Sequence, residues 1–524
     1  MSKTNFELLK DLLEDNKDTE YGKKHNFAQI NSIEDYKKNV PLTEYNDYKS
    51  YIDRMVKGEE NILSAYKIKN FNCTSGTSGP QKLIPISAKS LEKYAMTVDK
   101  YVKHISIHKN EKEKTLFTRV FHIDINKELD RILLLTEGYY YFLYKSGIMD
   151  FNKYVDKEIM FDPDTMDFFY EKVWCAILEE NIVSFEATYL YELLQLFNYF
   201  ETNYKEIISD IRNRRINPEK KLSEKCKSFL LNMPFTEERL SFVEKECEKG
   251  FDDIAHRIWK NIRLISGVQD KTHTFQSHSL HRFTGDVDID NEVFGMSEGL
   301  VGYPLEYNTF SYCLDLNSAF YEFIPYSEEN EESNNSNETL TINEIKQGQK
   351  YELILTNFSG FYRYHTEDVL NIVSIDSRGI LFEYCFRKNM GLNVGGEKTN
   401  LSQLVNAMSK LNESIPDILE YKLGGTLINN VGIYYLFLCV PSKQKIDIPA
   451  EEISKKFDTL LRKINFGYEH YRELNILQLP KTILLETNEY NELFSIDPKI
   501  KRHNKEKLFI TEDALKKILK EKNY

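Results

Sequence analysis

The stretch "FNCTSGTSGPQKLIPIS", residues 71–87, governs how the rest of this sequence is interpreted. Its centre alternates Thr and Ser with Gly76 and Gly79, and Lys82 follows shortly after a proline. Glycine lets a backbone turn tightly and present its N–H groups to a ligand, and the hydroxyls add short donors for phosphate oxygens. The composition therefore fits a phosphate-binding loop, although an ordinary Ser/Gly surface loop has the same composition.

A Walker-type nucleotide loop is the first alternative, and its pattern is G-x-x-x-x-G-K-[ST]. The segment from Gly76 to Lys82 does not match this spacing. The stretch "GLNVGGEKT", residues 391–399, comes close, but Glu397 separates its last glycine from Lys398. Because neither segment matches, a P-loop nucleotidase is disfavoured.

The whole chain has the composition of a soluble globular protein. Of its 524 residues 41% are hydrophobic and 29% charged, which excludes a disordered chain and allows about two to four folding units. The net charge of -13 disfavours nucleic acid as a partner. Seven scattered cysteines without a C-x-x-C pair favour reduced thiols, and so the cytoplasm. No apolar run approaches a membrane span or a signal core, so no membrane partner is expected.

The order of patterns along the chain predicts two domains. Helical and strand-like segments alternate through residue 300, which favours α/β architecture, and the segments after residue 310 are rich in strand formers and aromatics. The stretch "RKNMGLNVGGEKTN", residues 387–400, is a polar connection punctuated by glycine. We therefore expect an N-terminal domain over 1–386, a hinge over 387–391 and a small α+β domain over 392–524.

Several separated motifs together resemble one known family. Residues 71–87 resemble the "TSGTTGxPK"-like phosphate loop of acyl-adenylate-forming enzymes. "VFGMSEGLVGYP" (293–304), "YELILTNFSGFYRYHTEDVLNIV" (351–373) and "FRKNMGLNVGGEKTN" (386–400) then follow in the order found in the Gretchen Hagen family. The members of this family are auxin-responsive acyl acid amido synthetases. The resemblance extends from about Thr19 to Asn400.

The resemblance implies both a fold and a reaction. The fold is α/β: a large N-terminal adenylate-forming domain, with β-sheets, flanking helices and a β-barrel-like part, and a small α+β C-terminal lid. The reaction uses ATP and Mg2+ to adenylate a small carboxylic acid, whose acyl group then passes to an amine, for which an amino acid is implied. Two alternatives stay open: an adenylating ligase that transfers the acyl group to a thiol, and a non-catalytic relative that binds nucleotide.

The same resemblance assigns the nucleotide-binding residues. It makes a phosphate loop of Ser75, Gly76, Thr77 and Ser78, with Lys82 as a mobile escort for the leaving pyrophosphate. This loop is one residue shorter than in plant members, so a changed loop path is expected.

The "GMSEG" element supplies the expected metal ligand. Glu298 matches the carboxylate that holds magnesium, and oxygen donors suit this ion. Its neighbours Gly295, Met296 and Ser297 are expected to border the adenine and the α-phosphate.

The segment "YRYHTEDVL" supplies the expected ribose contact. Asp368 matches the carboxylate that accepts hydrogen bonds from both ribose hydroxyls. Tyr364 either lines the nucleotide or belongs to the core. Where the family has Arg-Val-Gly, this chain has His365, Thr366 and Glu367, and the loss of the glycine is expected to shift the turn.

Three basic residues of the C-terminal part complete the implied machinery. Arg387 matches the hinge element, and Lys398 matches a lysine that reaches the α-phosphate. Lys499, together with Arg502, matches a second catalytic basic element near the C-terminus, although a solvated basic surface fits the same run equally well.

The acyl pocket is expected beside the phosphate loop. Tyr94, Val98 and Tyr101 recur at helical spacing, and Phe121 lies beyond them in the sequence. They are candidates to line the pocket, but the same stripe also fits plain core. The sequence does not choose among aryl acids, indole acids and short fatty acids, and it gives no oligomeric state.

Overall fold

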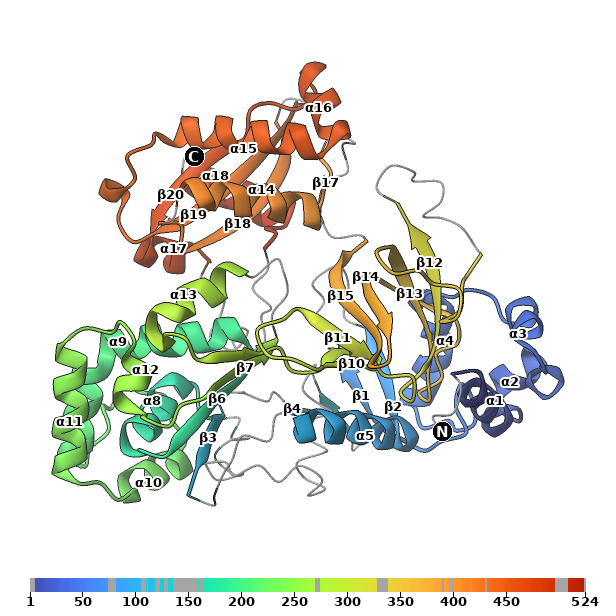
Figure 1. Cartoon of the computed structure of the whole chain (residues 1–524), viewed down its shortest axis with the longest axis horizontal. Helices are drawn as coiled ribbons and strands as arrows, with labels where there is room; N and C mark the ends of the chain where they lie inside the picture. Colours follow the sequence, from blue (N-terminus) through green and yellow to red (C-terminus); the bar gives the residue numbers. More distant parts are fainter. Residues whose placement is uncertain are drawn as a thin grey trace. The chain divides into compact units, whose positions relative to one another are not determined.

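The computed structural model of the chain contains two compact units (Figure 1). The first comprises Met1–Asp270 and Leu280–Tyr384, and the second comprises Lys271–Ser279 and Cys385–Tyr524. The structure describes residues 5–73, 82–104, 110, 112–117, 123–126, 131–134, 159, 162, 164–268, 274–327, 338–388, 391–394, 397, 399–415, 417–428, 431–494 and 508–522.

The first unit begins with short helices that pack against the core. Apolar residues at helical spacing near the N-terminus form one side of α1 (Asn5–Asn16), where Leu9 and Leu12 are fully buried. Ser32 caps α3 with its side chain, as a hydroxyl at a helix N-terminus does. The remaining helices of this segment are α2 (Glu20–Lys24), α3 (Ile33–Asn39) and α4 (Tyr45–Val56).

Two four-stranded sheets follow in the first unit. One has the order β2-β1-β5-β4, and the residues expected to bind phosphate connect β1 to β2. The other has the order β3-β6-β7-β8 and is parallel throughout. Their strands are β1 (Ile68–Cys73), β2 (Leu83–Ser87), β3 (Lys114–Phe117), β4 (Ile123–Asn126), β5 (Arg131–Leu134), β6 (Ile182–Tyr189), β7 (Leu264–Val268) and β8 (Asp288–Asp290).

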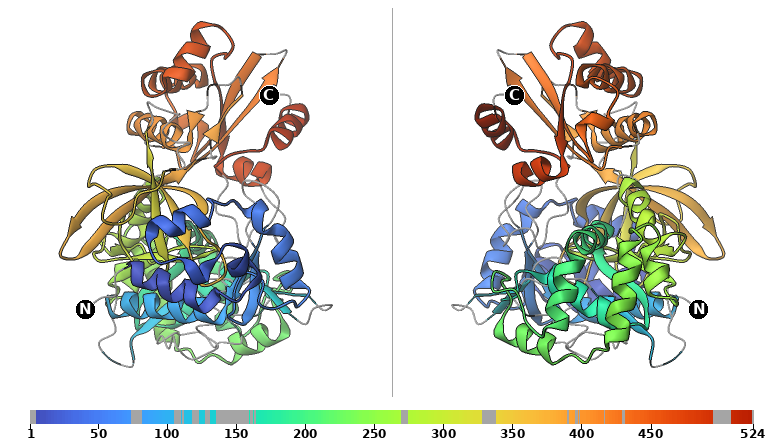
Figure 2. Two further views of the ribbon diagram at one scale, coloured as in Figure 1. Left: turned by 90° about the vertical axis from the view of Figure 1, so that its right-hand side faces the viewer. Right: turned by 90° about the vertical axis from the view of Figure 1, so that its left-hand side faces the viewer.

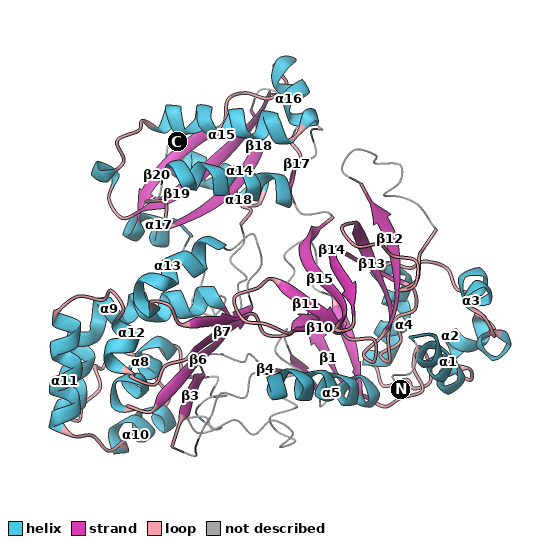
Figure 3. Ribbon diagram, in the orientation of Figure 1, coloured by secondary structure: helices cyan, strands magenta, loops and turns pink. Residues whose placement is uncertain are grey.

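Helices cover one face of the parallel sheet, and Figure 3 shows a cluster of them on one side of β6 and β7. Alternate strand residues, among them Phe185, Ile265 and Ile289, point into the apolar core beneath these helices. The helices are α8 (Phe168–Leu178), α9 (Leu190–Arg212), α10 (Glu224–Asn232), α11 (Glu237–Glu248), α12 (Ile254–Ile258) and α13 (Thr274–Thr284). Helix α5 (Ala88–His104) packs against β2 and against β10 (Gly299–Pro304).

The strand-rich region expected after residue 310 supplies five strands of a seven-stranded sheet of order β12-β13-β14-β15-β11-β10-β9, and the hairpin β9–β10 just before it supplies the other two. Its long curved strands are the yellow and orange ribbons of Figure 2. The mixed α/β fold predicted from the sequence is confirmed. The strands are β9 (Phe294–Met296), β10 (Gly299–Pro304), β11 (Ser311–Leu314), β12 (Phe320–Tyr326), β13 (Lys350–Thr356), β14 (Tyr364–Asp376) and β15 (Gly379–Arg387).

The second unit is a small α+β body. Its sheet has the order β18-β19-β20, and the central strand β19 is buried along almost its whole length. The elements are β16 (Gly391–Leu392), β17 (Thr399–Asn400), α14 (Leu401–Ser414), β18 (Glu420–Ile428), β19 (Val431–Val440), α15 (Ala450–Ile464), α16 (Phe466–Glu473), β20 (Lys481–Glu486), α17 (Thr487–Phe494) and α18 (Glu512–Lys522). In neither unit does a described helix combine the length and the apolar character needed to cross a bilayer.

One buried ion pair joins the N-terminal helices to the seven-stranded sheet. The Arg363 guanidinium donates to the Glu322 carboxylate at 3.0 Å, and the two side chains are only 5% and 1% exposed. Its other N–H groups donate to the carbonyl oxygens of Lys37 and Val40 and to the Thr339 hydroxyl. A buried charge pair is stable only when such additional hydrogen bonds satisfy it, and this pair meets that condition.

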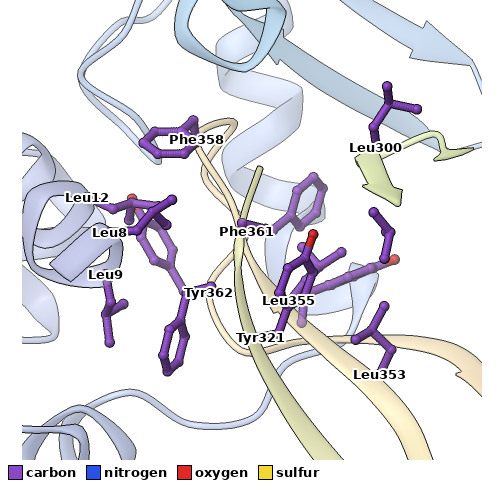
Figure 4. Close-up of a cluster of buried hydrophobic side chains, with 14 of the residues drawn as sticks. Leu8, Leu9, Leu12, Leu300, Tyr321, Leu353, Leu355, Phe358, Phe361 and Tyr362 are labelled. Carbon is purple, nitrogen blue, oxygen red and sulfur yellow. The ribbon is translucent and has the colours of Figure 1, made fainter. Parts of the chain in front are cut away.

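Close to this pair, residues 358–362 run through the main apolar core. Figure 4 shows Leu8, Leu9 and Leu12 of α1 on one side of this segment and Leu300, Leu353 and Leu355 on the other. The Tyr362 ring is fully buried, stacks on Tyr21 at 5.0 Å and donates its hydroxyl to the carbonyl oxygen of Leu63.

Removal of the Arg363 side chain should strongly destabilise the first unit. Arg363→Leu leaves Glu322 buried without its cation, and such a loss costs about 3–5 kcal/mol. We expect a clear fall in the melting temperature, and we expect Glu322→Leu in the same chain to restore part of it. Arg54→Leu is the control, because Arg54 forms exposed pairs with Glu20 and Glu59. Equal falls in the melting temperature of Arg363→Leu and Arg54→Leu would contradict a special role for the buried pair.

Candidate active site

The hairpin formed by β9 and β10 presents Glu298. Gly299 pairs with Met296, so Ser297 and Glu298 form the turn between the two strands. The Glu298 side chain is 7% exposed. Gly295, Met296 and Ser297, the predicted neighbours of the nucleotide, therefore lie directly beside this carboxylate in the chain.

Asn357 fixes the position of this turn. Its side-chain amide donates to the carbonyl oxygen of Glu298 at 3.0 Å. Its Oδ1 accepts from the backbone N–H groups of Ser359 and Phe361 at 2.9 and 3.2 Å. Gly360 completes the turn with φ +103, where a Cβ atom would lie 2.6 Å from Leu63. Glu298 is thus tied to a rigid turn at the end of β13, fifty-nine residues away in the sequence.

A small cavity lies against Glu298. Its volume is about 20 Å³, enough for about one water molecule. The cavity brings together Glu298 and Tyr94, two of the residues singled out in the sequence. Its lining consists of Ser90, Lys93 and Tyr94 of α5, Glu298, Gly299, Leu300 and Val301 of the hairpin, and Ser318, Ala319, Tyr321, Leu355, Asn357 and Phe358.

The expected ribose ligand Asp368 sits in a bulge of β14. Glu352 pairs with Val369 and Ile354 pairs with His365, so residues 366–368 lie opposite Leu353 alone. The Thr366 hydroxyl donates to the carbonyl oxygen of Leu353 at 2.7 Å and accepts from the Asp368 N–H at 3.1 Å. Bulges of this kind occur beside active sites because they redirect a side chain out of the ladder.

Glu367, in the middle of the bulge, has φ +64. This is the left-handed region, which is unfavourable for residues other than glycine. The glycine that the resemblance leads one to expect here is replaced by a residue that adopts a glycine-like conformation. The turn is therefore made at the expense of backbone strain.

Tyr364 lies in the core next to this bulge. It is 3% exposed, and its ring centroid is 4.7 Å from that of Phe361 and 6.4 Å from that of Tyr48. These contacts agree with the core alternative raised for Tyr364, and a contact with the nucleotide stays a prediction. The neighbouring His365 ring lies 2.8 Å from the Glu352 carboxylate.

Lys82 begins the described chain after the expected phosphate loop. Its ammonium lies 5.4 Å from the centre of the Tyr45 ring, within cation–π range. The hydroxyl of Tyr45 also accepts the Leu83 N–H at 2.9 Å. Ser75, Gly76, Thr77, Ser78, Phe121, Lys398, Lys499 and Arg502 lie outside the described residues.

The predicted stripe on α5 is buried. Tyr94, Val98 and Tyr101 are 5%, 1% and 3% exposed. Tyr94 reaches the cavity at Glu298, whereas Tyr101 donates its hydroxyl to the Asp290 carboxylate at 2.5 Å. One helix face therefore connects two polar centres.

Arg387 is the last residue of β15 and belongs to the second unit. It is half-buried. No group of three or more His, Cys, Asp and Glu side chains suited to a metal occurs within the described part of the chain.

Two residues of this site had no signal strong enough to be predicted. Asn357 is an ordinary polar residue in the sequence, and its importance depends on its contact with Glu298. Lys93 lines the cavity and lies 5.0 Å from the centre of the Phe358 ring. In the sequence Lys93 is merely adjacent to Tyr94. Adjacent helix residues do not share a face, so this position gave little indication that Lys93 lines the same cavity.

Comparison with known proteins gives the chain a family. The GH3 family N-terminal domain matches residues 1–289, and the GH3 family central domain matches residues 312–385. The chain is 24% identical over 471 residues to the indole-3-acetic acid-amido synthetase GH3.3 of Arabidopsis thaliana, covering 85% of this chain and 78% of that protein. It is 25% identical over 459 residues to the 4-substituted benzoates-glutamate ligase GH3.12 of the same plant, covering 83% and 78%.

A solved structure agrees with this result. The GH3.15 acyl acid amido synthetase superposes with a TM-score of 0.85 at 21% identity, covering 99% of this chain and 93% of that chain. This structural similarity shows the fold, and the matched family domains show the family membership. The resemblance drawn from the motifs is confirmed: the chain belongs to the GH3 family of acyl acid amido synthetases.

Proposed function

We propose that this chain adenylates a small carboxylic acid with ATP and transfers the acyl group to the amine of an amino acid. The relatives GH3.3 and GH3.12 carry the names of an amido synthetase and an acid–glutamate ligase. One observation carries the proposal: the segment 357–368 positions both carboxylates that are predicted to bind the nucleotide. Asn357 at its start fastens Glu298, and Asp368 ends it in a bulge.

The first half-reaction needs control of charge at phosphate. A carboxylate oxygen of the acid attacks the α-phosphorus of ATP, the bond to the β-phosphate oxygen breaks, and pyrophosphate leaves. Loop N–H groups, hydroxyls and lysines stabilise this developing charge. We assign these roles to Ser75, Gly76, Thr77, Ser78 and Lys82.

Glu298 is the proposed ligand of Mg2+. This ion usually takes one or two protein carboxylates and completes its shell with phosphate oxygens and waters. A single buried carboxylate at a fixed turn fits that requirement. Its role is to hold the ion against the phosphates, where the ion supplies positive charge.

Asp368 is the proposed ligand of the ribose. The bulge takes it out of the strand ladder, and an acceptor-only carboxylate suits a vicinal diol. We keep Tyr364, Gly295, Met296 and Ser297 as the nearest candidates to border the nucleotide.

The second half-reaction belongs to the C-terminal part. The amine nitrogen attacks the acyl carbon, the bond to the AMP oxygen breaks, and the amine loses a proton. We propose that residues 392–524 act as a lid that turns about a hinge at 387–391, with Arg387 in the hinge. Lys398 and Lys499 are proposed to stabilise charge at the α-phosphate.

The acyl acid is proposed to lie along α5. Tyr94, Val98 and Tyr101 form its helical wall, and Phe121 is a further candidate. We also propose a cytoplasmic location, since the six cysteines with described side chains are free thiols: Cys175, Cys226, Cys247, Cys313, Cys385 and Cys439.

Acid-dependent exchange of labelled pyrophosphate into ATP tests the first half-reaction. With ATP, magnesium and a panel of carboxylic acids, Glu298→Gln should lower exchange by at least about 100-fold, as loss of a group that manages phosphoryl charge does. Asp368→Asn should also lower exchange, because it removes the proposed acceptor of the ribose hydroxyls. Asp376→Asn is the control, because this exposed carboxylate of the same strand pairs only locally with Arg378. It should exchange normally.

If no acid of the panel raises pyrophosphate exchange above the rate without acid, the proposal is overturned. Addition of amino acids or thiols, with mass analysis of the product, then tests the second half-reaction. An amide supports the proposed transfer, whereas a thioester formed in its place would assign the chain to the thiol ligases.

The strained bulge offers an independent prediction. Glu367→Gly removes both the carboxylate and the backbone strain, whereas Glu367→Ala removes the carboxylate alone. We expect the Gly variant to be more stable than the Ala variant by about 1 kcal/mol, since a left-handed conformation costs about this much for a residue with a Cβ. Thermal unfolding of the two proteins measures the difference. Equal melting temperatures would show that the bulge is not strained.

A further inference from the structure

A threonine hydroxyl spans the bulge of β14. Thr366 donates this hydroxyl to the carbonyl oxygen of Leu353 on β13 at 2.7 Å. The same hydroxyl oxygen accepts the backbone N–H of Asp368 at 3.1 Å. Thr366 is only 2% exposed, so water does not compete for either hydrogen bond. One side chain therefore connects the neighbouring strand to the backbone of the proposed ribose ligand.

The contact with Asp368 is a local turn, in which a hydroxyl accepts the N–H of the residue two positions further on. Serine and threonine form such turns, and these turns restrict the backbone between the two residues. The residue restricted here is Glu367. Because the peptide that leads into Asp368 is held, the direction in which the Cα–Cβ bond of Asp368 leaves the chain is held as well. The hydrogen bond to Leu353 fastens the turn to β13.

The backbone of Glu367 makes this support necessary. Its φ of +64 lies in the left-handed region, which costs about 1 kcal/mol for a residue with a Cβ atom. Such a conformation persists only where the surrounding contacts impose it. The hydrogen bond from the Asp368 N–H to Thr366 closes the chain around Glu367 and opposes its relaxation to a right-handed conformation. Without the hydroxyl, we expect residue 367 to relax and Asp368 to turn with it.

The chain on either side of the bulge is held by other contacts. On one side, the His365 N–H donates to the carbonyl oxygen of Thr43 at 2.9 Å. On the other side, Val369 pairs with Glu352, and the Val369 side chain is fully buried. Loss of the threonine hydroxyl should therefore rearrange residues 366–368 and leave the rest of β14 in place.

We propose that Thr366 is a positioning residue for the nucleotide: its hydroxyl directs Asp368 toward the ribose and thereby sets the preference for a nucleotide that carries both ribose hydroxyls. The inference rests on the proposed function, in which Asp368 accepts hydrogen bonds from this diol. Thr366 acts through Asp368 and makes no contact with the nucleotide in this arrangement. If Asp368 is displaced, the nucleotide loses its ribose contact and keeps its contacts at the phosphates and the base.

Nucleotides that lack one ribose hydroxyl test this role in the full-length protein. In the pyrophosphate exchange assay, kcat/KM is measured for ATP, 2′-deoxy-ATP and 3′-deoxy-ATP, each with the acid of the panel that supports the fastest exchange. The wild type should prefer ATP over each deoxynucleotide by about 10- to 100-fold, the range for one hydrogen bond to a charged group.

Thr366→Val keeps the shape of the side chain and removes the hydroxyl. It should lower the preference for ATP by about 3- to 10-fold. The change should be a higher KM for ATP rather than a lower kcat, because the ribose contact is made in the ground state as well as in the transition state. Use of the two deoxynucleotides should change little.

Three further variants make the result specific. Thr366→Ser keeps the hydroxyl and should retain most of the preference. Thr284→Val is the matched control, because Thr284 is also buried and donates its hydroxyl to the carbonyl oxygen of Leu280 at 3.2 Å. It should leave the preference unchanged. In the Glu367→Gly background, where glycine adopts positive φ without strain, Thr366→Val should still lower the preference. This last comparison is the test if Thr366→Val alone does not fold.

The outcomes separate this inference from the proposed function. An unchanged preference in Thr366→Val, alone or in the Glu367→Gly background, would overturn the positioning role and leave adenylation standing. An equal fall in the use of all three nucleotides would do the same, and so would an equal loss of preference in Thr366→Ser. A wild type that shows acid-dependent exchange without a preference for ATP would overturn the ribose contact of Asp368, and the positioning role with it. Absence of acid-dependent exchange would overturn the proposed function itself.

Discussion

The buried pair of Arg363 and Glu322 is the constraint on which the candidate site depends. Every N–H group of this guanidinium is used, on a carboxylate, on two backbone carbonyls and on a hydroxyl. The pair therefore fixes the chain at Arg363, which has φ +49. Six residues before it stands Asn357, and five residues after it stands Asp368. Because the chain is fixed at Arg363, the positions of Asn357 and Asp368, at the two ends of the segment 357–368, are restricted as well.

The strain in this segment has a physical explanation. Arg363 and Glu367 both have positive φ, which is rare for residues with a side chain. Such conformations persist only where surrounding contacts over-determine them, and they concentrate at functional sites. Here the ion pair holds the first residue, and the Thr366 hydroxyl bridges the strands beside the second. The result is a carboxylate, Asp368, that leaves the strand ladder at a fixed place.

Local signals predicted much of this fold, and long-range contacts account for most of what they missed. The helical pattern after Ser87 corresponds to α5, and its stripe of Tyr94, Val98 and Tyr101 is buried as its spacing indicated. The hydrogen bond from Asn357 to Glu298 joins residues far apart in sequence. Neither motif contains a pattern that predicts this hydrogen bond, because a single asparagine and a backbone carbonyl form no periodic signal. The buried role of Arg363 could not be predicted either, because a charged residue is usually exposed and only the structure shows Glu322 beside it.

Asp290 was missed for a related reason, and the comparison with Glu322 shows how buried acids can be told apart. Both carboxylates are almost fully excluded from water. Glu322 faces a guanidinium and a hydroxyl, so its charge is balanced inside the protein and its role is to hold the fold. Asp290 faces hydroxyls, a backbone N–H and other acids, and one of its oxygens is left over. Burial raises the pKa of Asp290 to about 7, so this carboxyl can give up its charge by protonation near neutral pH. Buried acids can therefore be told apart by what removes their charge: the Arg363 guanidinium balances that of Glu322, whereas a proton can remove that of Asp290.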